Sequence, residues 1–541
     1  MGNSAVKRAL SSFSVMIAFA AIASALPACA PKQDDVEQIP ARRAGDESDA
    51  AGSDTSNLDG TDGLVDADPR AAEMNSRADR ALETLMLRFW RHIREDKNLH
   101  YWTYAQHWDV VLDGAERLGP SAYRGTARMF FELQNSRGWI RDHYDDENWM
   151  VLTLIHAYDR TLEEVYLAKA RELFADVMNG WDDTCCGASK GGIWWRKAKD
   201  GKNNAVNAGA VVSASRLFER TKEPSYLAFA KKAYEFWSKN MVDQQSGHVF
   251  DNVTSSGVID KERSLTYNEG MMIGAAVALA KAEGNGSRLE LAHKIAGYMM
   301  ANEVASTSIG TILSDGNCGT KAGDGNEQFK GVSARYLAEL YLADRSHTEY
   351  REFLVRSAEA LWTLARDPAS GLFTCNWEGP YNPEISSVHS TTSAAAALAA
   401  AARILGPAAK RPALEYEGEE ANLHGVGLEA NYAGFEGWGY AAGWGADGTS
   451  LDFVVDAPAE GTYDVELRYA SSAAASRRVS VNGKMTTAKL EFPVTGDYKI
   501  YRTVTTAVTL TAGSNVVTFA FDTASASAGF INLDRARFIP K

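Results

Sequence analysis

The stretch Tyr-Leu-Ala-Lys-Ala-Arg-Glu-Leu-Phe-Ala-Asp-Val, residues 166–177, shows the pattern that decides the fold of most of this chain. Its larger apolar residues recur every three or four positions. That spacing places them on one face of an α-helix packed against a core. Similar stripes recur about a dozen times between residues 70 and 406, joined by loops rich in Gly, Asn, Asp and Trp.

About a dozen helices in sequential pairs are compatible with a bundle, a superhelical repeat or a closed ring of hairpins. No fixed-period sequence repeat is visible, which argues against the superhelical repeat. We therefore predict an all-α (α/α)6 toroid over residues 70–406.

The pattern changes to short alternating strands after residues 406–412. The pair Asn482-Gly483 is a strong hairpin signal. The alternating runs are residues 451–455, 463–469, 479–481, 516–521 and 536–539. Residues 413–541 are therefore predicted to form an all-β sandwich, jelly-roll-like, so the chain is multidomain.

The N-terminus is typical of an exported protein. Residues 1–29 join a basic start to a short apolar run that ends in Leu26-Pro27-Ala28-Cys29. This ending resembles a bacterial lipoprotein box, which would lipidate Cys29. Because Pro27 is unusual there, ordinary secretion stays open. Residues 30–69 are acidic and almost free of aromatics, which predicts a disordered linker.

The net charge of −14 argues against a nucleic-acid partner. We expect a monomeric bacterial protein, either secreted or held at the cell surface or outer membrane by its lipid anchor alone.

The other four cysteines do not have the spacing of a zinc site. A bridge between Cys318 and Cys375 is expected, whereas the neighbours Cys185 and Cys186 rarely pair with each other. Buried free thiols are the alternative.

Residues 143–149, His-Tyr-Asp-Asp-Glu-Asn-Trp, open a helix and carry the strongest chemical signal. Acidic residues in a first helical turn often only cap backbone N–H groups and meet the positive end of the helix dipole. Here, however, the pair Asp145-Asp146 is flanked by Tyr144 and Trp149, side-chain types that stack on sugars.

Several sequence blocks resemble glycoside hydrolase family 76, the bacterial endo-α-1,6-mannanases. In chain order the blocks are Tyr144-Asp145-Asp146 with Trp149, residues 191–195 with 202–205, residues 266–270, and residues 329–332 with 335–336. Glu269 stands where Gln is more usual in the family.

The resemblance implies an (α/α)6 barrel and a retaining, endo-acting hydrolase of α-1,6-mannan that needs no cofactor for catalysis. It also makes Asp145 the nucleophile and Asp146 the general acid/base. Retention requires two carboxyl groups about 5–5.5 Å apart, one ionised and one protonated. The expected sugar contacts in this domain are Tyr144, Trp149, Trp194, Trp195, Asn204, Tyr267, Asn268, Lys330 and Trp377.

The C-terminal domain resembles carbohydrate-binding modules of families 35 and 6, through residues 416–421 and 531–538. The resemblance implies that Glu417, Glu419 and Asp534 hold a structural Ca²⁺, for which carboxylate oxygens are suitable ligands. Asn532, with Tyr432 or Trp438, is the expected sugar contact of this module.

Two other functions stay open at this point. A helical toroid also suits a hydrolase or epimerase that acts on a different glycan. A non-catalytic glycan-binding protein of the cell surface is the third candidate.

Overall fold

The structure, a computed structural model, describes residues 68–96, 99–186, 190–262, 265–316 and 326–541. The predicted signal segment with Cys29, and nearly all of the predicted linker, lie outside these residues, so export and lipidation stay predictions. Within the described ranges no helix has the length and apolarity to cross a membrane.

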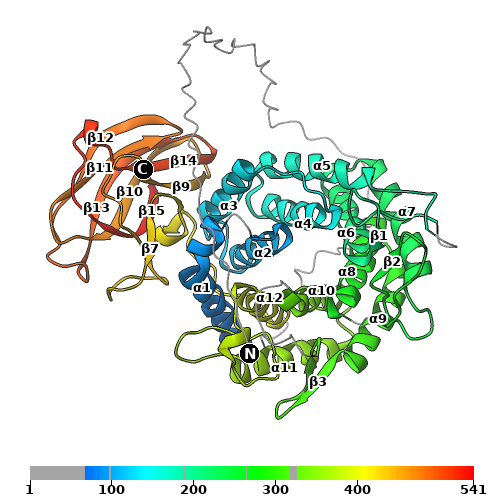
Figure 1. The fold of residues 1–541 in the computed structure, drawn as a ribbon. Helices are drawn as coiled ribbons and strands as arrows, with labels where there is room; N and C mark the ends of the chain where they lie inside the picture. The colour runs from blue at the N-terminus through cyan, green and yellow to red at the C-terminus, as the bar shows by residue number, and fades with distance from the viewer. Residues whose placement is uncertain (1–67, 97–98, 187–189, 263–264, 317–325) are drawn as a thin grey trace, which may run out of the picture. The chain divides into compact units, whose positions relative to one another are not determined.

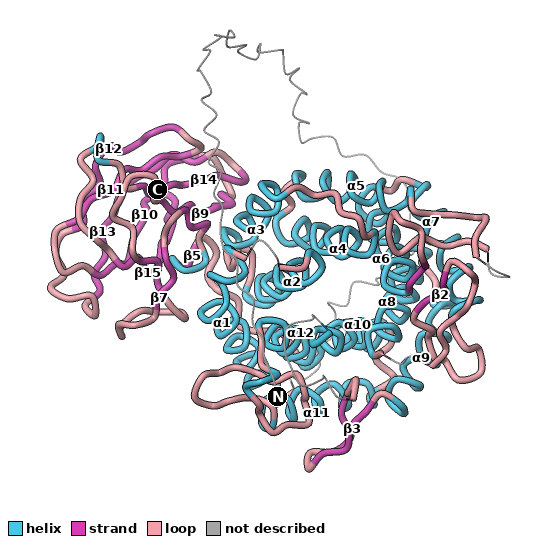
Figure 2. Tube along the Cα trace, in the orientation of Figure 1, coloured by secondary structure: helices cyan, strands magenta, loops and turns pink. Residues whose placement is uncertain are grey.

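Most helices lie in the first part of the chain and most strands in the last part (Figure 2). The helical domain runs from residue 71 to residue 405. Its helices are α1 (Ala71–Glu95), α2 (Tyr101–Leu118), α3 (Arg124–Arg137), α4 (Tyr144–Thr161), α5 (Glu164–Asn179), α6 (Asn204–Thr221), α7 (Pro224–Met241), α8 (Thr266–Glu283), α9 (Leu289–Asn302), α10 (Phe329–Ala343), α11 (Thr348–Leu364) and α12 (Val388–Leu405). Two small antiparallel sheets also lie in this domain: β1 (Gly201–Asn203) pairs with β2 (Asn252–Thr254) across α6 and α7, and β3 (Val304–Thr307) forms a hairpin with β4 (Gly310–Leu313).

The even-numbered helices form a closed inner ring (Figure 1). Each contacts the next along the series from α2 to α12, and α12 contacts α2. The odd-numbered helices pack outside the ring: α5, α7, α9 and α11 each contact both neighbours in sequence, α3 contacts α2, and α1 packs mainly against α12 and also against α2. This arrangement confirms the predicted (α/α)6 toroid.

Small residues let the inner helices approach closely near their first turns. Every residue of α12 except Arg403 is buried. A Cβ built on Gly270 of α8 would lie 2.7 Å from the Cα of Ser333, and one on Gly331 of α10 would lie 2.9 Å from the Cα of Ser393. Because each contact joins the first or second turn of one helix to the second turn of the next, α8, α10 and α12 run parallel and begin at the same end of the ring.

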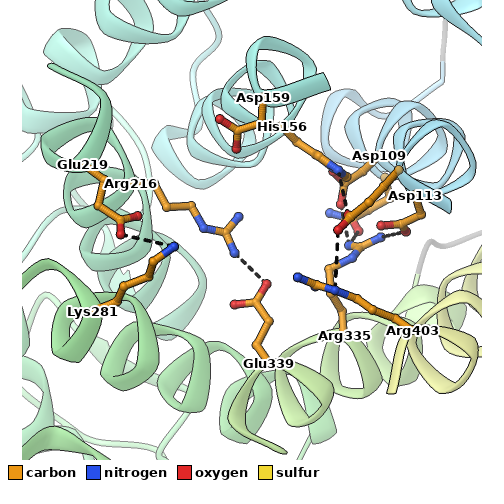
Figure 3. Close-up of polar contacts among 12 residues, drawn as sticks. Asp109, Asp113, His156, Asp159, Arg216, Glu219, Lys281, Arg335, Glu339 and Arg403 are labelled. Atoms are coloured by element: carbon orange, nitrogen blue, oxygen red, sulfur yellow. Dashed lines mark hydrogen bonds and ion pairs between the residues drawn. The ribbon is translucent and has the colours of Figure 1, made fainter. Parts of the chain in front are cut away.

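The later turns of the inner helices carry a network of charges (Figure 3). Arg335 of α10 lies 2.6 Å from Asp109 and 2.8 Å from Asp113, both on α2. His156 of α4 lies 2.7 Å from Asp109. Burial opposes a charged imidazole, but the hydrogen bond and charge of Asp109 outweigh it and raise the pKa of His156 to about 9. This cluster joins three inner helices by charge.

Further ion pairs extend this network to the remaining inner helices. Arg216 of α6 lies 2.7 Å from Glu339 of α10. The other pairs are Lys281 of α8 with Glu219 of α6 at 3.5 Å, and Arg403 of α12 with Glu116 of α2 at 3.6 Å. All six inner helices therefore exchange charge contacts toward their C-terminal ends, away from their first turns.

The C-terminal domain consists of two antiparallel sheets. One has the order β13-β10-β15-β8-β7, with β5 also paired to β15, and the other has the order β12-β11-β14-β9-β6. Their strands are β5 (Glu415–Glu417), β6 (Asn422–His424), β7 (Gly427–Glu429), β8 (Tyr440–Ala442), β9 (Ser450–Ala457), β10 (Gly461–Ala470), β11 (Ala475–Val481), β12 (Lys484–Phe492), β13 (Tyr501–Leu510), β14 (Gly513–Ala520) and β15 (Asn532–Pro540). Alternate residues of β10 and β14 are buried, as the predicted sandwich requires.

The hairpin turn predicted at Asn482-Gly483 joins β11 to β12. Both residues have positive φ, 49° and 76°, which is the conformation that a two-residue type I′ turn demands. The short side chain of Asn and the absence of one in Gly explain this choice of residues.

Glu420 connects the two domains. Its carboxylate accepts a hydrogen bond from the backbone N–H of Tyr123 at 2.9 Å, and its carbonyl accepts one from the hydroxyl of Thr126 at 3.0 Å. Arg411, in the connecting segment, pairs with the same carboxylate at 2.6 Å.

Two expectations about the cysteines have different outcomes. Cys185 and Cys186 form a disulfide with each other, so the expectation that they would not pair was wrong. Cys375 is also disulfide-bonded, whereas its expected partner, Cys318, lies outside the described residues.

We expect Gly270→Ala to destabilise the protein. Alanine is the better helix former by about 0.5–1 kcal/mol, but overpacking against a backbone atom costs about 1–3 kcal/mol. In the matched control Gly297→Ala, in helix α9, the new Cβ meets nothing within 4 Å and should stabilise. Chemical denaturation of both variants measures the two free energies of unfolding. A Gly270→Ala variant as stable as Gly297→Ala would refute the close-packing argument.

Candidate active site

The candidate site lies at the end of the ring where the inner helices begin. Asp145 and Asp146 occupy the first turn of α4, and Asn203 is the N-cap of α6. Tyr267 and Lys330 follow the first residues of α8 and α10. Helix N-termini carry partial positive charge and free N–H groups, so this end of the ring favours negative charge.

Asp145 accepts hydrogen bonds on both carboxylate oxygens. Its Oδ2 accepts from the indole Nε1 of Trp195 at 2.8 Å and from the amide of Asn203 at 3.0 Å. Its Oδ1 accepts from the backbone N–H of Asp146 at 2.9 Å. Burial raises the pKa of Asp145, and the three donors oppose that rise. They therefore favour its ionised form.

The pKa of Asp146 is also raised, but by a different balance of causes. Burial, followed by the charge of Asp145, raises the pKa of Asp146 to about 8. A hydrogen bond to the backbone of Trp102 opposes this rise without cancelling it. The surroundings therefore treat the two acids unequally: hydrogen-bond donors favour the carboxylate form of Asp145, whereas burial and repulsion favour the protonated form of Asp146. A half-buried pair of this kind can act as nucleophile and general acid.

The third acid of the first turn, Glu147, has a structural role. It is fully buried, and its Oε1 accepts from the backbone N–H of Arg141 at 2.6 Å, with the Nζ of Lys197 at 3.4 Å. Burial raises the pKa of Glu147 to about 7. Its contacts hold the loop that leads into α4.

A chain of aromatic rings connects the helix starts. The ring centroids of Trp102 and Trp149 lie 6.2 Å apart, those of Trp102 and Phe329 lie 6.0 Å apart, and those of Phe329 and Tyr267 lie 4.5 Å apart. Trp102 and Phe329 are half-buried, whereas Trp149 and Tyr267 are buried. The half-buried rings are the better placed of the four to contact a ligand.

Of the sugar contacts predicted in the helical domain, only Trp195 is exposed, at 36%. It also touches Asp145 directly, which makes it the best supported contact. Tyr144 and Trp194 are buried, and the Nζ of a lysine lies over each ring, Lys197 over Tyr144 and Lys202 over Trp194. The indole N–H of Trp194 also donates to Asp182.

Asn204 and Asn268 are fully buried and hold the helices around the site together. The side chain of Asn204 binds the carbonyl of Asn268 at 3.0 Å and the indole of Trp237 at 2.6 Å. Asn268 and the hydroxyl of Tyr267 both donate to Asp251, at 3.2 and 2.6 Å. These amides therefore join α6, α7 and α8 and leave no exposed face for a sugar.

Lys330 and Trp377 are also buried, at 1% and 0% exposure. The Nζ of Lys330 lies 3.7 Å from Asp315 and 5.5 Å from the ring centroid of Trp377. Trp377 was an expected sugar contact, but the structure packs its ring into the core.

Glu269, where the family more often has Gln, is fully buried. Its Oε1 accepts from the backbone N–H of Val249 at 2.8 Å. Burial and then the charge of Glu303 raise the pKa of Glu269 well above its usual range. A protonated Glu has nearly the shape of Gln and, like Gln, can donate as well as accept a hydrogen bond.

In the β domain the two expected aromatic contacts differ in exposure. Trp438 is 4% exposed and donates its backbone N–H to Glu419 at 3.1 Å, so its ring is packed inside. Tyr432 is 39% exposed and stacks on Tyr498, with centroids 5.7 Å apart. Asn532 is buried at the start of β15.

The three acids expected to bind Ca²⁺ are buried. The charges of neighbouring acids act on Glu417 and Glu419. Burial and then the charge of Glu420 raise the pKa of Glu417 to about 8; burial and then Glu417 raise the pKa of Glu419 well above its usual range. In each, Oε2 is buried without a hydrogen-bond partner among the described residues. Asp534 differs, because its carboxylate pairs with Arg468 and accepts from the N–H of Glu436 at 3.0 Å.

Sequence reasoning did not select Asn203, Trp102 or Phe329 as site residues. Asn203 and Phe329 lie inside the blocks that resemble the family, so their position beside selected residues was an available signal. Trp102 lies at the start of its own helix, and only the closing of the ring brings it to Asp146.

The family model described as Glycosyl hydrolase family 76 matches residues 73–413, and the one described as Carbohydrate binding module (family 6) matches residues 418–540. The structure of an α-1,6-mannanase from Salegentibacter sp. HEL1_6 is 26% identical, with a TM-score of 0.55, and the match covers 62% of this chain and 100% of that one. An inactive variant of that α-1,6-mannanase, with two consecutive aspartates changed to asparagine, is in complex with α-1,6-mannotriose; it is 25% identical, with a TM-score of 0.55 and coverage of 61% and 99%.

Curated relatives match over shorter lengths. A mannan endo-1,6-α-mannosidase of Saccharomyces cerevisiae is 26% identical over 206 residues, 34% of this chain and 46% of that protein. An exo-β-D-glucosaminidase of Amycolatopsis orientalis is 35% identical over 132 residues, 24% of this chain and 12% of that protein. The chain thus spans less than half the length of either relative. The match to the first family model covers more than half of the chain, and the chain therefore belongs to glycosyl hydrolase family 76.

Proposed function

We propose that this protein is a retaining, endo-acting glycoside hydrolase that cleaves α-1,6-mannosidic bonds in a mannan-type polysaccharide. The observation that carries the proposal is the unequal environment of Asp145 and Asp146, one held by three donors and the other with a pKa raised to about 8. The α-1,6-mannanase that resembles the helical domain supports the choice of substrate. Its inactive double-aspartate variant supports the choice of catalytic pair.

The proposed reaction has two steps. First, the carboxylate of Asp145 forms a bond to the anomeric carbon, while Asp146 transfers its proton to the leaving glycosidic oxygen. Second, the carboxylate of Asp146 takes a proton from water, whose oxygen attacks the anomeric carbon and releases Asp145. Two displacements at one carbon retain its configuration.

The β domain supplies sugar binding in this proposal, with the exposed Tyr432, which stacks on the half-buried Tyr498, as the stacking surface. Glu417 and Glu419 would hold a structural Ca²⁺, because each buries a carboxylate oxygen without a partner among the described residues. Bound Ca²⁺ would neutralise the repulsion between these acids. Asp534 would join them only by loosening its pairing with Arg468.

Replacing either proposed catalytic acid should strongly reduce turnover. We expect Asp145→Asn and Asp146→Asn each to lower the release of reducing ends from linear α-1,6-mannan by about 10²- to 10⁴-fold. The exposed neighbour Asp142 gives the matched control Asp142→Asn, which should retain activity.

NMR of the first-formed anomer tests retention in the wild-type protein. Near-wild-type turnover in both variants would refute the catalytic pair, and a product of inverted configuration would refute the two-step mechanism. A wild-type protein that binds mannan and releases no reducing ends would instead be a binding protein.

Trp195→Phe should change the pH profile. Loss of the indole donor removes a hydrogen bond that favours ionised Asp145, so the pKa of Asp145 rises. Since attack needs the carboxylate, the acidic limb of kcat/KM should move upward by about one pH unit, corresponding to about 1.5 kcal/mol. Trp181→Phe is the control, because that indole donates to the exposed Asp183 at 2.7 Å. An unshifted acidic limb in Trp195→Phe would contradict this role.

Ca²⁺ should stabilise the protein after treatment with a chelator. At a concentration of about 100 times Kd, binding to the native state alone adds about 2.7 kcal/mol, so Tm should rise. The rise should vanish in Glu419→Gln and persist in the control Glu460→Gln, an exposed loop residue. Equal Tm values with and without Ca²⁺ in the wild-type protein would exclude the site.

A further inference from the structure

A second cluster of ligand-type side chains lies on the outer layer of the helical domain. His293 comes from α9, and Asp344 and His347 come from the segment between α10 and α11. Their ligand atoms all lie within 4.8 Å of one another. The three side chains are partly exposed, at 19%, 34% and 33%, so a dissolved ion can reach them.

The atoms that face one another are those that a metal ion would need. Asp344 Oδ2 lies 3.3 Å from the Nε2 of His293 and 3.8 Å from the Nε2 of His347. Ligand atoms about 2.0–2.1 Å from a tetrahedral ion lie about 3.3 Å from one another. The first distance already has this value, and a small rotation of the more exposed His347 would bring the second to it.

Each of the three ligands is oriented by a second contact. The Nδ1 of His293 hydrogen-bonds the hydroxyl of Tyr350 at 3.0 Å, and the Nδ1 of His347 hydrogen-bonds Glu349 at 2.7 Å. The other oxygen of Asp344 accepts from the backbone N–H and hydroxyl of Ser346, at 3.1 and 2.6 Å. Contacts of this kind fix the orientation of metal-binding histidines and raise metal affinity.

A second triad in the same domain has similar spacing but is unsuitable for binding a metal ion. Asp113, Glu116 and His156 also lie within 4.8 Å of one another. There, however, Arg335 pairs with Asp113 at 2.8 Å and Arg403 with Glu116 at 3.6 Å, so cations already neutralise the acids. Over the described part of the chain, no lysine or arginine forms an ion pair with Asp344.

We propose that His293, Asp344 and His347 form a binding site for a divalent transition-metal ion of the Zn²⁺ type. Two imidazole nitrogens and one carboxylate oxygen suit Zn²⁺ and not Ca²⁺ or Mg²⁺, which prefer oxygen ligands alone. Water would complete the fourth position. The bound ion would cross-link α9 to the segment between α10 and α11, and so brace the outer layer. The site is independent of the catalytic pair and of the proposed activity.

The test is calorimetric titration of the chelator-treated, full-length protein with ZnCl₂, in excess Ca²⁺ so that oxygen-only sites are filled. We expect the wild-type protein to bind one equivalent that is lost in His347→Ala and in Asp344→Asn. Glu349→Gln, which keeps all three ligands, should raise the Kd for this Zn²⁺ ion about tenfold. His92→Ala is the control, because His92 faces a single acid, Asp96, at 3.7 Å.

Two further measurements accompany the titration. Circular dichroism verifies that each variant is folded, and Co²⁺ in place of Zn²⁺ should give visible absorption bands in the wild-type protein and not in His347→Ala. Zn²⁺ should also raise the Tm of the wild-type protein and leave the Tm of His347→Ala unchanged. The proposal would be overturned if His347→Ala and Asp344→Asn both still bound one equivalent of Zn²⁺ with unchanged Kd. It would also be overturned if the wild-type protein bound no Zn²⁺.

Discussion

The parallel packing of six inner helices in a closed ring is the constraint on which the site depends. The ring can close only where side chains are small, as at Gly270 and Gly331, because the neighbouring backbone leaves no room for a Cβ. Parallel packing then brings the first turns of all six helices to one end. Candidate catalytic, amide and aromatic residues that are distant in sequence meet there, and the segment between α5 and α6 adds Trp195.

The two ends of the ring handle charge differently. Toward the C-terminal ends, acids and bases from different helices neutralise one another, as Asp109, His156 and Arg335 do. At the N-terminal ends, the neighbouring acids Asp145 and Asp146 share the site and repel each other. That repulsion, with burial, raises the pKa of Asp146, while three donors favour the ionised Asp145. The asymmetry that the proposed acid and nucleophile chemistry needs therefore comes from neighbouring groups, since the two side chains are chemically identical.

Much of the fold and part of the site could be predicted from the sequence. Helical spacing, the Asn482-Gly483 turn and the alternating strands are local patterns, and the structure confirms the fold class that they indicate. The adjacency of Asp145 and Asp146 is also local. Exposure was harder to predict, because Trp195 and Trp377 both lie in loops and only one keeps an accessible ring.

What the sequence by itself determined is what depends on neighbours along the chain: element type, turn conformation and the pair of acids at a helix start. The tertiary structure alone decided which groups meet across the chain. It placed the donors of Trp195 and Asn203 on Asp145, and it gathered His293 with Asp344 and His347. Such contacts arise when helices far apart in sequence pack side by side, and periodicity within one helix carries no information about its partner.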